Sequence, residues 1–293
     1  MSPQSWLLAI RPRTLPLAVA SMLLGAGTAA QAGAFNGGVL TLALLTALLL
    51  QILSNLANDY GDGVRGTDSI NRTGPTRVLA SGLASPDQLR NAMIVTAALA
   101  TGSGLLLLWA ALGPDVGAWL GFMALGSCAL LAALGYTLGR RPYGYLGLGD
   151  VAVFVFFGPV AVLGCSYLMQ HRLSESAGWA SLTAGLLAVA VLNINNIRDM
   201  DTDRQAGKHT LALRLGLRRA RAYQLLLLGG AVLAGTRIMT EPGFVSLLAL
   251  WPLARATQLV LTGQGAELNR ALALTARGTL AFTGLLALGL VVG

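Results

Sequence analysis

The chain contains long stretches without a charged side chain, and these stretches limit what it can fold into. Between Arg90 and Arg140 the only charged residue is Asp115. Further uncharged runs cover residues 151–170, 176–197, 222–236 and 278–293. Each run approaches or exceeds the ~18–20 apolar residues that cross a bilayer. Only 11% of all residues are charged, against about 25% in a typical soluble domain. The sequence therefore predicts an integral membrane protein.

The hydropathy pattern predicts an all-α membrane protein, a bundle of about nine transmembrane helices. They are expected at about residues 15–33, 38–58, 91–112, 116–138, 147–170, 177–198, 221–237, 242–262 and 273–292. The segment before Pro16, which contains Trp6, is expected to form a short helix at the membrane interface. No soluble domain or linker separates these helices, so a single transmembrane domain is expected over residues 1–293.

The distribution of basic residues predicts a cytoplasmic N-terminus. In this orientation only Arg172 and Arg237 lie outside, so eighteen of the twenty basic residues lie on the cytoplasmic side, in agreement with the positive-inside rule. The net charge of +8 is thereby explained without a nucleic-acid partner. Cys128 and Cys165 fall within apolar runs, which is typical of small buried residues rather than of a disulfide or a metal site.

Six of the twelve acidic residues are concentrated in two short segments on the predicted cytoplasmic side. The first acidic segment, residues 55–68, contains Asp59, Asp62 and Asp68. The second acidic segment, residues 193–203, contains Asp199, Asp201 and Asp203. Steps of three or four residues place side chains on one face of a helix. In each segment such a face combines asparagines and carboxylates: Asn55, Asn58, Asp59 and Asp62 in the first, and Asn195, Asn196, Asp199 and Asp203 in the second.

The two acidic segments together indicate a cation site rather than two capped helix ends. Carboxylates at a helix C-terminus oppose the helix dipole, and asparagines deeper in the membrane are costly without partners. Ligands that are all oxygen, without His or Cys, favour Mg²⁺ when a phosphate completes its shell. Basic residues that could bind a diphosphate follow each segment. They are Arg65, Arg72 and Arg77 after the first, and Arg204, Lys208 and Arg214 after the second.

These residues resemble the UbiA-type intramembrane prenyltransferase superfamily. The resemblance lies in the pattern Asn58-Asp59-x-x-Asp62 with a later Asp, and in Asp199-x-x-x-Asp203 four helices on. Three stretches are further similar to the 1,4-dihydroxy-2-naphthoate polyprenyltransferases of menaquinone synthesis. They are residues 55–62 (NLANDYGD), 141–150 (RPYGYLGLGD) and 195–216 (NNIRDMDTDRQAGKHTLALRLG). The similarity runs from the N-terminus to about residue 220, and the last three helices match in hydropathy only.

The resemblance implies a bundle around a central cavity whose cytoplasmic mouth carries both acidic segments. It implies that Mg²⁺ is held by Asn58, Asp62, Asp199 and Asp203, with Asp59 and Asp68 in support. Asp68 departs from the commonest superfamily spacing, because it follows Asp62 by a longer interval. The residues with implied catalytic roles are Asp59, Asp62, Asp199, Asp203 and Lys208; for diphosphate binding they are Arg65, Arg72, Arg77, Lys208 and Arg214; for acceptor binding they are Asn55, Tyr143, Tyr145 and Asp150.

The implied reaction transfers a polyprenyl group from polyprenyl diphosphate to 1,4-dihydroxy-2-naphthoate, releasing diphosphate and CO₂ and giving demethylmenaquinone. The implied location is the bacterial cytoplasmic (inner) membrane, with the active site toward the cytoplasm. Other acceptors stay open at this point, namely 4-hydroxybenzoate, haem or a chlorophyllide. A cation-coupled transporter would also place Asp and Asn in the membrane, but near its midplane on interrupted helices. The sequence specifies neither the prenyl chain length nor the oligomeric state.

Overall fold

The computed structural model describes residues 2–67, 74 and 76–293 of the chain. The regular secondary structure of this part is helical throughout. The long single helices are α2 (Leu15–Gln31), α3 (Gly37–Val64), α4 (Pro86–Leu112), α5 (Val116–Gly135), α8 (Glu175–Arg198), α11 (Leu217–Thr236) and α13 (Leu268–Val292). Two further spans are composite: α6 (Gly149–Val155), η2 (Phe156–Leu163) and α7 (Gly164–Gln170) in one, η3 (Pro242–Ala249) and α12 (Leu250–Thr262) in the other. The short elements are α1 (Pro3–Ile10), η1 (Tyr143–Leu146), α9 (Met200–Gln205), α10 (Leu211–Leu215) and η4 (Gly265–Glu267).

These nine long segments of the described residues correspond to the nine predicted helices, in the same order. The largest differences are at helix ends. α3 continues to Val64 rather than ending near residue 58, so the helix itself carries Asp59 and Asp62. α4 begins at Pro86 rather than near residue 91, because Ser85 and Gln88 form a capping box around its first turn.

The hydropathy of the helices supports a membrane location for most of them. By length and composition, seven of the described helices can cross a membrane, and the bent pair of α1 and α2 would make an eighth. α11 is the remaining long helix, and its first turns carry Arg218, Arg219 and Arg221, which lower its hydropathy. The expected multi-pass, all-helical fold is thus confirmed with seven or eight candidate spans among the described residues, and α11 is a long helix outside that set.

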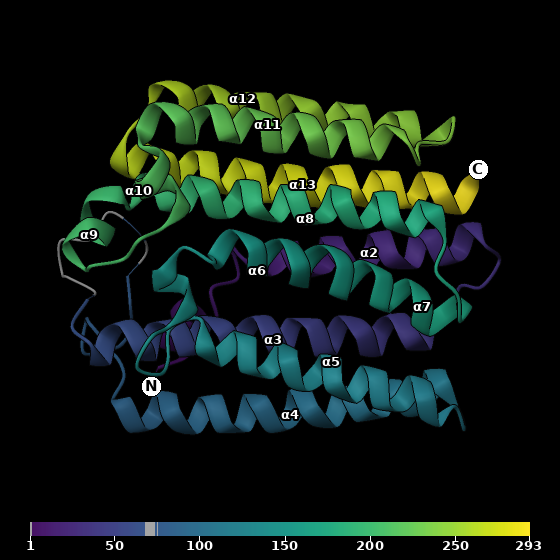
Figure 1. Ribbon diagram of the computed structural model, residues 1–293, viewed down its shortest axis with the longest axis horizontal. Helices are drawn as coiled ribbons and strands as arrows, with labels where there is room; N and C mark the ends of the chain where they lie inside the picture. Colours follow the sequence, from purple (N-terminus) through teal and green to yellow (C-terminus); the bar gives the residue numbers. More distant parts are fainter. Residues whose placement is uncertain (1, 68–73, 75) are drawn as a thin grey trace.

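The two acidic segments lie at the same end of the bundle. The long helices run side by side, and the C-terminal ends of α3 and α8 lie at the same end of the bundle as the short helices α9 and α10 (Figure 1). The N-terminus lies toward this end and the C-terminus at the other (Figure 1). Termini at opposite ends are expected for an odd number of spans.

The junction between α1 and α2 is a sharp bend tied to α3. The two helices meet at 54°, and Arg11, which follows α1, adopts a left-handed backbone conformation (φ 54°) that is unusual for a residue with a side chain. The Asn55 side-chain nitrogen donates hydrogen bonds to Ile10 O at 2.8 Å and to Thr14 Oγ1 at 2.9 Å. An asparagine of the first acidic segment therefore holds this bend in place.

Small residues allow the central helices to pack backbone to backbone. A side chain at Gly289 of α13 would come within 2.4 Å of the Gly243 Cα in η3. A side chain at Gly27 of α2 would come within 2.9 Å of the Ala287 Cα in α13. Such contacts between glycines and small residues are the usual means by which helices associate within a membrane. They make α2, α13 and η3 one closely packed wall.

The composite span of α6, η2 and α7 contains an eight-residue π-helix. η2 covers Phe156–Leu163 and includes Pro159, which lacks the backbone N–H that a regular helix requires. A side chain at Gly158 would come within 2.7 Å of Ser181 O in α8, so the widened turn lies directly on that helix. π-Helical turns are often found at functional sites, and this one faces a cavity.

Candidate active site

A large cavity runs along the bundle. It has a volume of about 790 Å³. One face of α3 lines it with Ala43, Thr46, Ala47, Leu50, Gln51, Ser54, Asn55, Asn58 and Asp62. At about 1.5 Å of rise per residue, this stripe is about 28 Å long. Carboxylates and amides line the end near Asp62, and mainly apolar side chains line the remainder. The cavity is thus polar at its mouth and apolar inside.

Residues of both acidic segments line this cavity. Asp62 comes from α3, whereas Asp199 follows α8 and Asp203 lies in α9. Asp62 and Asp199 are separated by 137 positions of the sequence. Asp199 separates the two helices, and Asp203 N donates to Asp199 O at 2.8 Å, which continues the helical path across the junction. The structure therefore brings together the two segments that were expected to share a site. Metal binding by them stays a prediction.

Asp62 is the centre of a network of charged and polar groups. Its side chain is 2% exposed. Lys208 Nζ lies 3.1 Å from Asp62 Oδ2, and an Arg77 nitrogen lies 3.6 Å from the same oxygen. The Tyr145 hydroxyl donates to its Oδ1 at 2.6 Å. Lys208 also lies 3.9 Å from an oxygen of Asp203. The only lysine of the sequence thus contacts both acidic segments.

Tyr145 lies between two cations. Lys208 Nζ lies 4.8 Å from the centroid of its ring, and the Arg65 guanidinium lies 5.3 Å from it, both within the range of cation–π attraction. Burial, and then the negative charge of Asp62, raises the pKa of the Tyr145 phenol to about 12. The phenol therefore stays protonated and donates its hydrogen bond to Asp62 throughout the neutral and mildly alkaline range.

Asp199 is held by an arginine that was not among the predicted site residues. Arg198 donates from Nε and Nη2 to the two carboxylate oxygens of Asp199, each at 2.7 Å. Nη2 also donates to Asn195 Oδ1 at 2.7 Å, and Nη1 donates to Asn269 Oδ1 at 2.9 Å. Its side chain is only 2% exposed. An arginine at the membrane end of a long uncharged run, next to an aspartate, was the sequence signal for this pair.

Asp59 occupies a different position from Asp62. It is fully buried, and its two carboxylate oxygens accept hydrogen bonds from the backbone N–H groups of Val78 and Leu79 at 3.0 and 3.1 Å. It is not among the residues that line the cavity. The contact fixes the segment that carries Arg77, so Asp59 supports the site from behind.

The predicted acceptor-binding residues fall into two groups. Asn55, Tyr143 and Tyr145 line the cavity. Asp150 is buried at the start of α6, near Tyr223 of α11, and it does not line the cavity. Tyr143 donates its hydroxyl proton to Ala132 O at 2.8 Å, and burial raises its pKa to about 12. Asp150 therefore lies outside the cavity lining, and its role in acceptor binding stays a prediction.

The predicted diphosphate-binding residues also fall into two groups, those that line the cavity and those that hold loops near its mouth. Arg77 and Lys208 line the cavity. Arg65 donates to Thr137 O and Gly139 O, and Arg214 donates to Leu146 O at 2.8 Å, so both fasten loops near the mouth. Asp68 and Arg72 lie outside the described residues.

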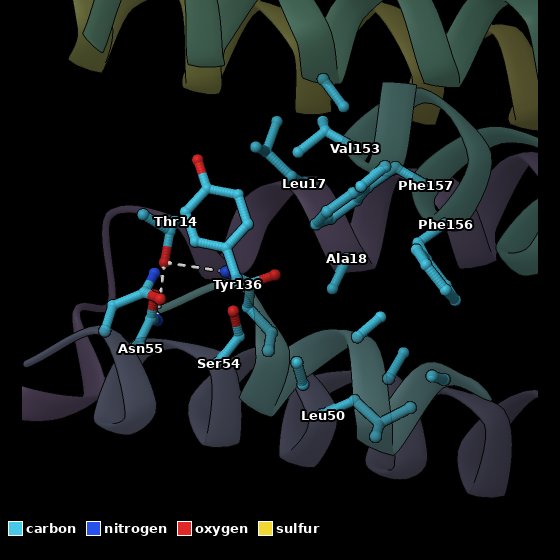
Figure 2. Close-up of a pocket in the computed structure, with 18 of the residues that line it drawn as sticks. Thr14, Leu17, Ala18, Leu50, Ser54, Asn55, Tyr136, Val153, Phe156 and Phe157 are labelled. Atoms are coloured by element: carbon cyan, nitrogen blue, oxygen red, sulfur yellow. Dashed lines mark hydrogen bonds between the residues drawn. The ribbon is translucent and has the colours of Figure 1, made fainter. Parts of the chain in front are cut away.

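An aromatic zone follows the polar mouth. Tyr136, which follows α5, projects its ring into the cavity beside Thr14 and Leu17, and Phe156 and Phe157 of η2 lie further inward (Figure 2). Tyr136 packs edge-on against Tyr143, with ring centroids 5.4 Å apart. Burial raises the pKa of the Tyr136 phenol above its usual range. These rings were not among the predicted site residues, because aromatic residues in apolar helices are most often core or interface residues.

The donor set at the mouth fits Mg²⁺ together with a phosphate. Asn58, Asp62, Asp199 and Asp203 offer oxygen atoms only, and Mg²⁺ is usually held by one or two carboxylates with phosphate oxygens and water completing its octahedron. Among the described residues, no three acidic, histidine or cysteine side chains gather closely enough to form a metal site by themselves. Ligands distributed over two walls of a cavity suit a metal that binds with a diphosphate between them.

Comparison with known sequences identifies relatives along almost the whole chain. The model of the UbiA prenyltransferase family matches residues 18–291. The chain is 46% identical over 248 residues to the 1,4-dihydroxy-2-naphthoate octaprenyltransferase of Escherichia coli (strain K12), which covers 85% of this chain and 79% of the relative. It is 40% identical over 296 residues to the 1,4-dihydroxy-2-naphthoate octaprenyltransferase of Haemophilus influenzae, with 98% of this chain and 96% of the relative covered.

Solved structures share the fold. A UbiA homolog from Aeropyrum pernix K1 matches with a TM-score of 0.66 at 18% identity, covering 100% of this chain and 98% of that chain. A UbiA homolog from Archaeoglobus fulgidus, solved bound to DMAPP and Mg²⁺, matches with a TM-score of 0.60 at 14% identity, covering 96% and 99%. At such low identity these matches establish the fold alone.

Proposed function

Because the chain belongs to the UbiA prenyltransferase family, we propose that it transfers a polyprenyl group from polyprenyl diphosphate to 1,4-dihydroxy-2-naphthoate. The observation that carries this proposal is the identity of 40–46% over most of the chain to enzymes of that activity. The cavity agrees with it, because it joins an acidic and basic mouth to a long apolar interior. The family, the multi-pass fold and the aromatic prenyltransferase activity predicted from the sequence are confirmed by these relatives.

The diphosphate of the donor binds at the mouth. Lys208 and Arg77 supply positive charge there, and Asn58, Asp62, Asp199 and Asp203 would hold Mg²⁺ against the diphosphate oxygens. Mg²⁺, when bound, stabilises the negative charge that develops on the departing oxygens. The solved relative with DMAPP and Mg²⁺ supports this assignment by its fold. Arg198 keeps Asp199 in one orientation by its two-point contact.

The prenyl chain lies in the apolar interior. Its first carbon would lie near Tyr136, and its tail would pass Phe156 and Phe157 (Figure 2). Aromatic faces attract positive charge, so these rings stabilise the allylic cation that forms as the C–O bond breaks. The apolar walls also exclude water, which would otherwise capture that cation.

The acceptor attacks through a ring carbon. In the proposed reaction the allylic C–O bond breaks, a C–C bond forms at the carbon that bears the carboxylate, and the carboxylate leaves as CO₂. The electron pair of the C–CO₂ bond returns to the ring, so no external oxidant or proton donor is required. Tyr143, Tyr145 and Asn55 line the part of the cavity next to the mouth and are the proposed acceptor contacts.

We also propose that the mouth faces the cytoplasm of a bacterial cell, in its inner membrane. The arginines of the loops at that end and the positive-inside rule support this orientation. A transporter is disfavoured, because Asp62 and Asp199 lie at helix ends by the cavity mouth, whereas coupling-ion sites lie near the midplane.

A direct assay tests the proposed acceptor. The purified protein would be given octaprenyl diphosphate, Mg²⁺ and either 1,4-dihydroxy-2-naphthoate labelled in its carboxyl group or 4-hydroxybenzoate. We expect prenylated naphthalenediol and labelled CO₂ in equal amounts, with little product from the benzoate. Prenylation of 4-hydroxybenzoate alone would refute the acceptor and leave the family assignment intact.

A further inference from the structure

Lys208 neutralises the carboxylates that are expected to hold the metal. Its Nζ lies 3.1 Å from Asp62 Oδ2 and 3.9 Å from Asp203 Oδ1. Arg77 adds a second positive charge 3.6 Å from Asp62, and Arg198 forms the two-point contact with Asp199. Three carboxylates of the cavity mouth are thus faced by three cations of the chain itself.

This arrangement affects how a divalent cation can enter. Opposite charges a few ångströms apart attract strongly in a site with little exposure to water, and the Asp62 side chain is 2% exposed. A metal arriving alone must displace the Lys208 ammonium, which then loses its partners. A diphosphate removes this penalty, because its oxygens accept hydrogen bonds from the displaced ammonium.

The surroundings of Lys208 allow such a transfer. His209 N donates to Tyr145 O at 2.9 Å, which fastens the turn bearing Lys208 to η1. Gly207 precedes it with φ at +69°, a conformation that suits glycine and forms the turn. The backbone is therefore held, while the flexible side chain lies over the Tyr145 ring at the cavity surface.

We propose that Lys208 is an internal counter-ion that makes metal uptake depend on diphosphate. Without diphosphate it joins Asp62 to Asp203; with metal and diphosphate together it passes to the diphosphate. The protein then has low affinity for Mg²⁺ alone and high affinity for Mg²⁺ with diphosphate. This inference rests on the proposed function, because that function supplies the diphosphate.

The test is metal binding to the protein without substrate. Lys208→Met removes the charge and keeps most of the side-chain length. The electron paramagnetic resonance of Mn²⁺ would measure free metal, with Mg²⁺ as competitor. We expect Lys208→Met to bind Mn²⁺ about tenfold more tightly than the wild type or better, since a nearby competing charge is gone. Equal or weaker binding would overturn the inference.

Matched variants show whether the gain arises at this site. Arg204→Met removes a cation of the same region that pairs with exposed Asp201 at 3.5 Å, and it should bind Mn²⁺ as the wild type does. Lys208→Arg keeps the charge and should also resemble the wild type. Adding Asp62→Asn to Lys208→Met should abolish the gain, and a gain that persists would place the metal elsewhere and refute the proposal.

Thermal unfolding of the wild type gives a second measurement that needs no variant to fold. A ligand that binds the folded state raises the melting temperature. Mg²⁺ and inorganic diphosphate together should raise it, and Mg²⁺ alone should not. An equal rise with Mg²⁺ alone would contradict the inference. Neither measurement involves the acceptor. A failure of this inference can therefore be told apart from a failure of prenyl transfer in the assay above.

Discussion

The ammonium of Lys208 lies 3.1 Å from the carboxylate of Asp62, across 146 positions of sequence. This contact joins the loop after α9 to the C-terminal end of α3, and it makes one site from the two acidic segments.

Substituting one cavity-lining aspartate in either acidic segment should abolish most of the activity. Asp62→Ala and Asp199→Ala should each lower turnover by about 10²–10³-fold, because stabilisation of the departing oxygens is lost. The double variant should be little worse than either single one, since parts of one unit are not additive. Asp201→Ala is the control, because the Asp201 side chain is 92% exposed and pairs with Arg204 outside the cavity. Additive losses would argue for two independent sites.

Arg198 should matter through Asp199. Arg198→Ala leaves a buried carboxylate without its two-point partner, a change that typically costs about 3–5 kcal/mol of stability. Arg198→Lys should restore stability in part but activity poorly, because a lysine cannot make the planar, two-point contact. Turnover at saturating Mg²⁺, its Mg²⁺ dependence and the melting temperature would be compared. If Arg198→Lys has the wild-type Mg²⁺ dependence, Arg198 does not orient Asp199.

Tyr145 should not limit activity at alkaline pH. Its pKa, raised to about 12 by burial and by Asp62, means that the protonated, donating form persists above the ordinary value of about 10. Any stability that this contact contributes is complete below about pH 10 and is lost only as the pH rises through about 12. If the activity of the wild type falls between about pH 8 and 10, the same fall should therefore be seen in Tyr145→Phe. A fall that disappears in the variant would assign the titration to Tyr145.

Asp150 and Tyr223 should act as a pair that supports the fold. Asp150→Asn and Tyr223→Phe each alter the polar contact between the Asp150 carboxyl of α6 and the Tyr223 phenol of α11, and the loss of one such contact typically costs about 1 kcal/mol. Both should lower the melting temperature by similar amounts and leave the KM for the acceptor almost unchanged. A selective rise of this KM in Asp150→Asn would restore the role in acceptor binding that the sequence suggested.

The orientation in the membrane can be tested by labelling single cysteines. In a background of Cys128→Ser and Cys165→Ala, a cysteine replacing Gln205 or Arg141 should be protected from a membrane-impermeant reagent in intact cells. A cysteine replacing Arg172 should react, because it lies at the other end of the bundle. Labelling of position 205 from outside would reverse the orientation and the placement of the active site.

The sequence predicted the elements of this fold well but their partners poorly. Helix positions follow from the uncharged runs, and periodicity placed Asn58 and Asp62 on one face of α3. Periodicity alone cannot show which distant residue meets a given face. The contact of Arg198 with Asn269 depends on α13 packing beside α8, and the capping of Val78 and Leu79 by Asp59 depends on the path of a loop. Asp150 likewise looked available for function, because its burial near Tyr223 of another helix depends on tertiary packing.

The stripe along α3 joins a polar and an apolar part of the cavity on a single helix. Asp62 lines the polar end of the cavity, and Leu50 and Ala43 line its apolar part. A reaction at that junction yields one product that dissolves in each phase: diphosphate at the aqueous end and a prenylated ring in the lipid. The two products therefore depart in different directions. Accumulated lipid product and accumulated diphosphate should then slow the enzyme independently of each other.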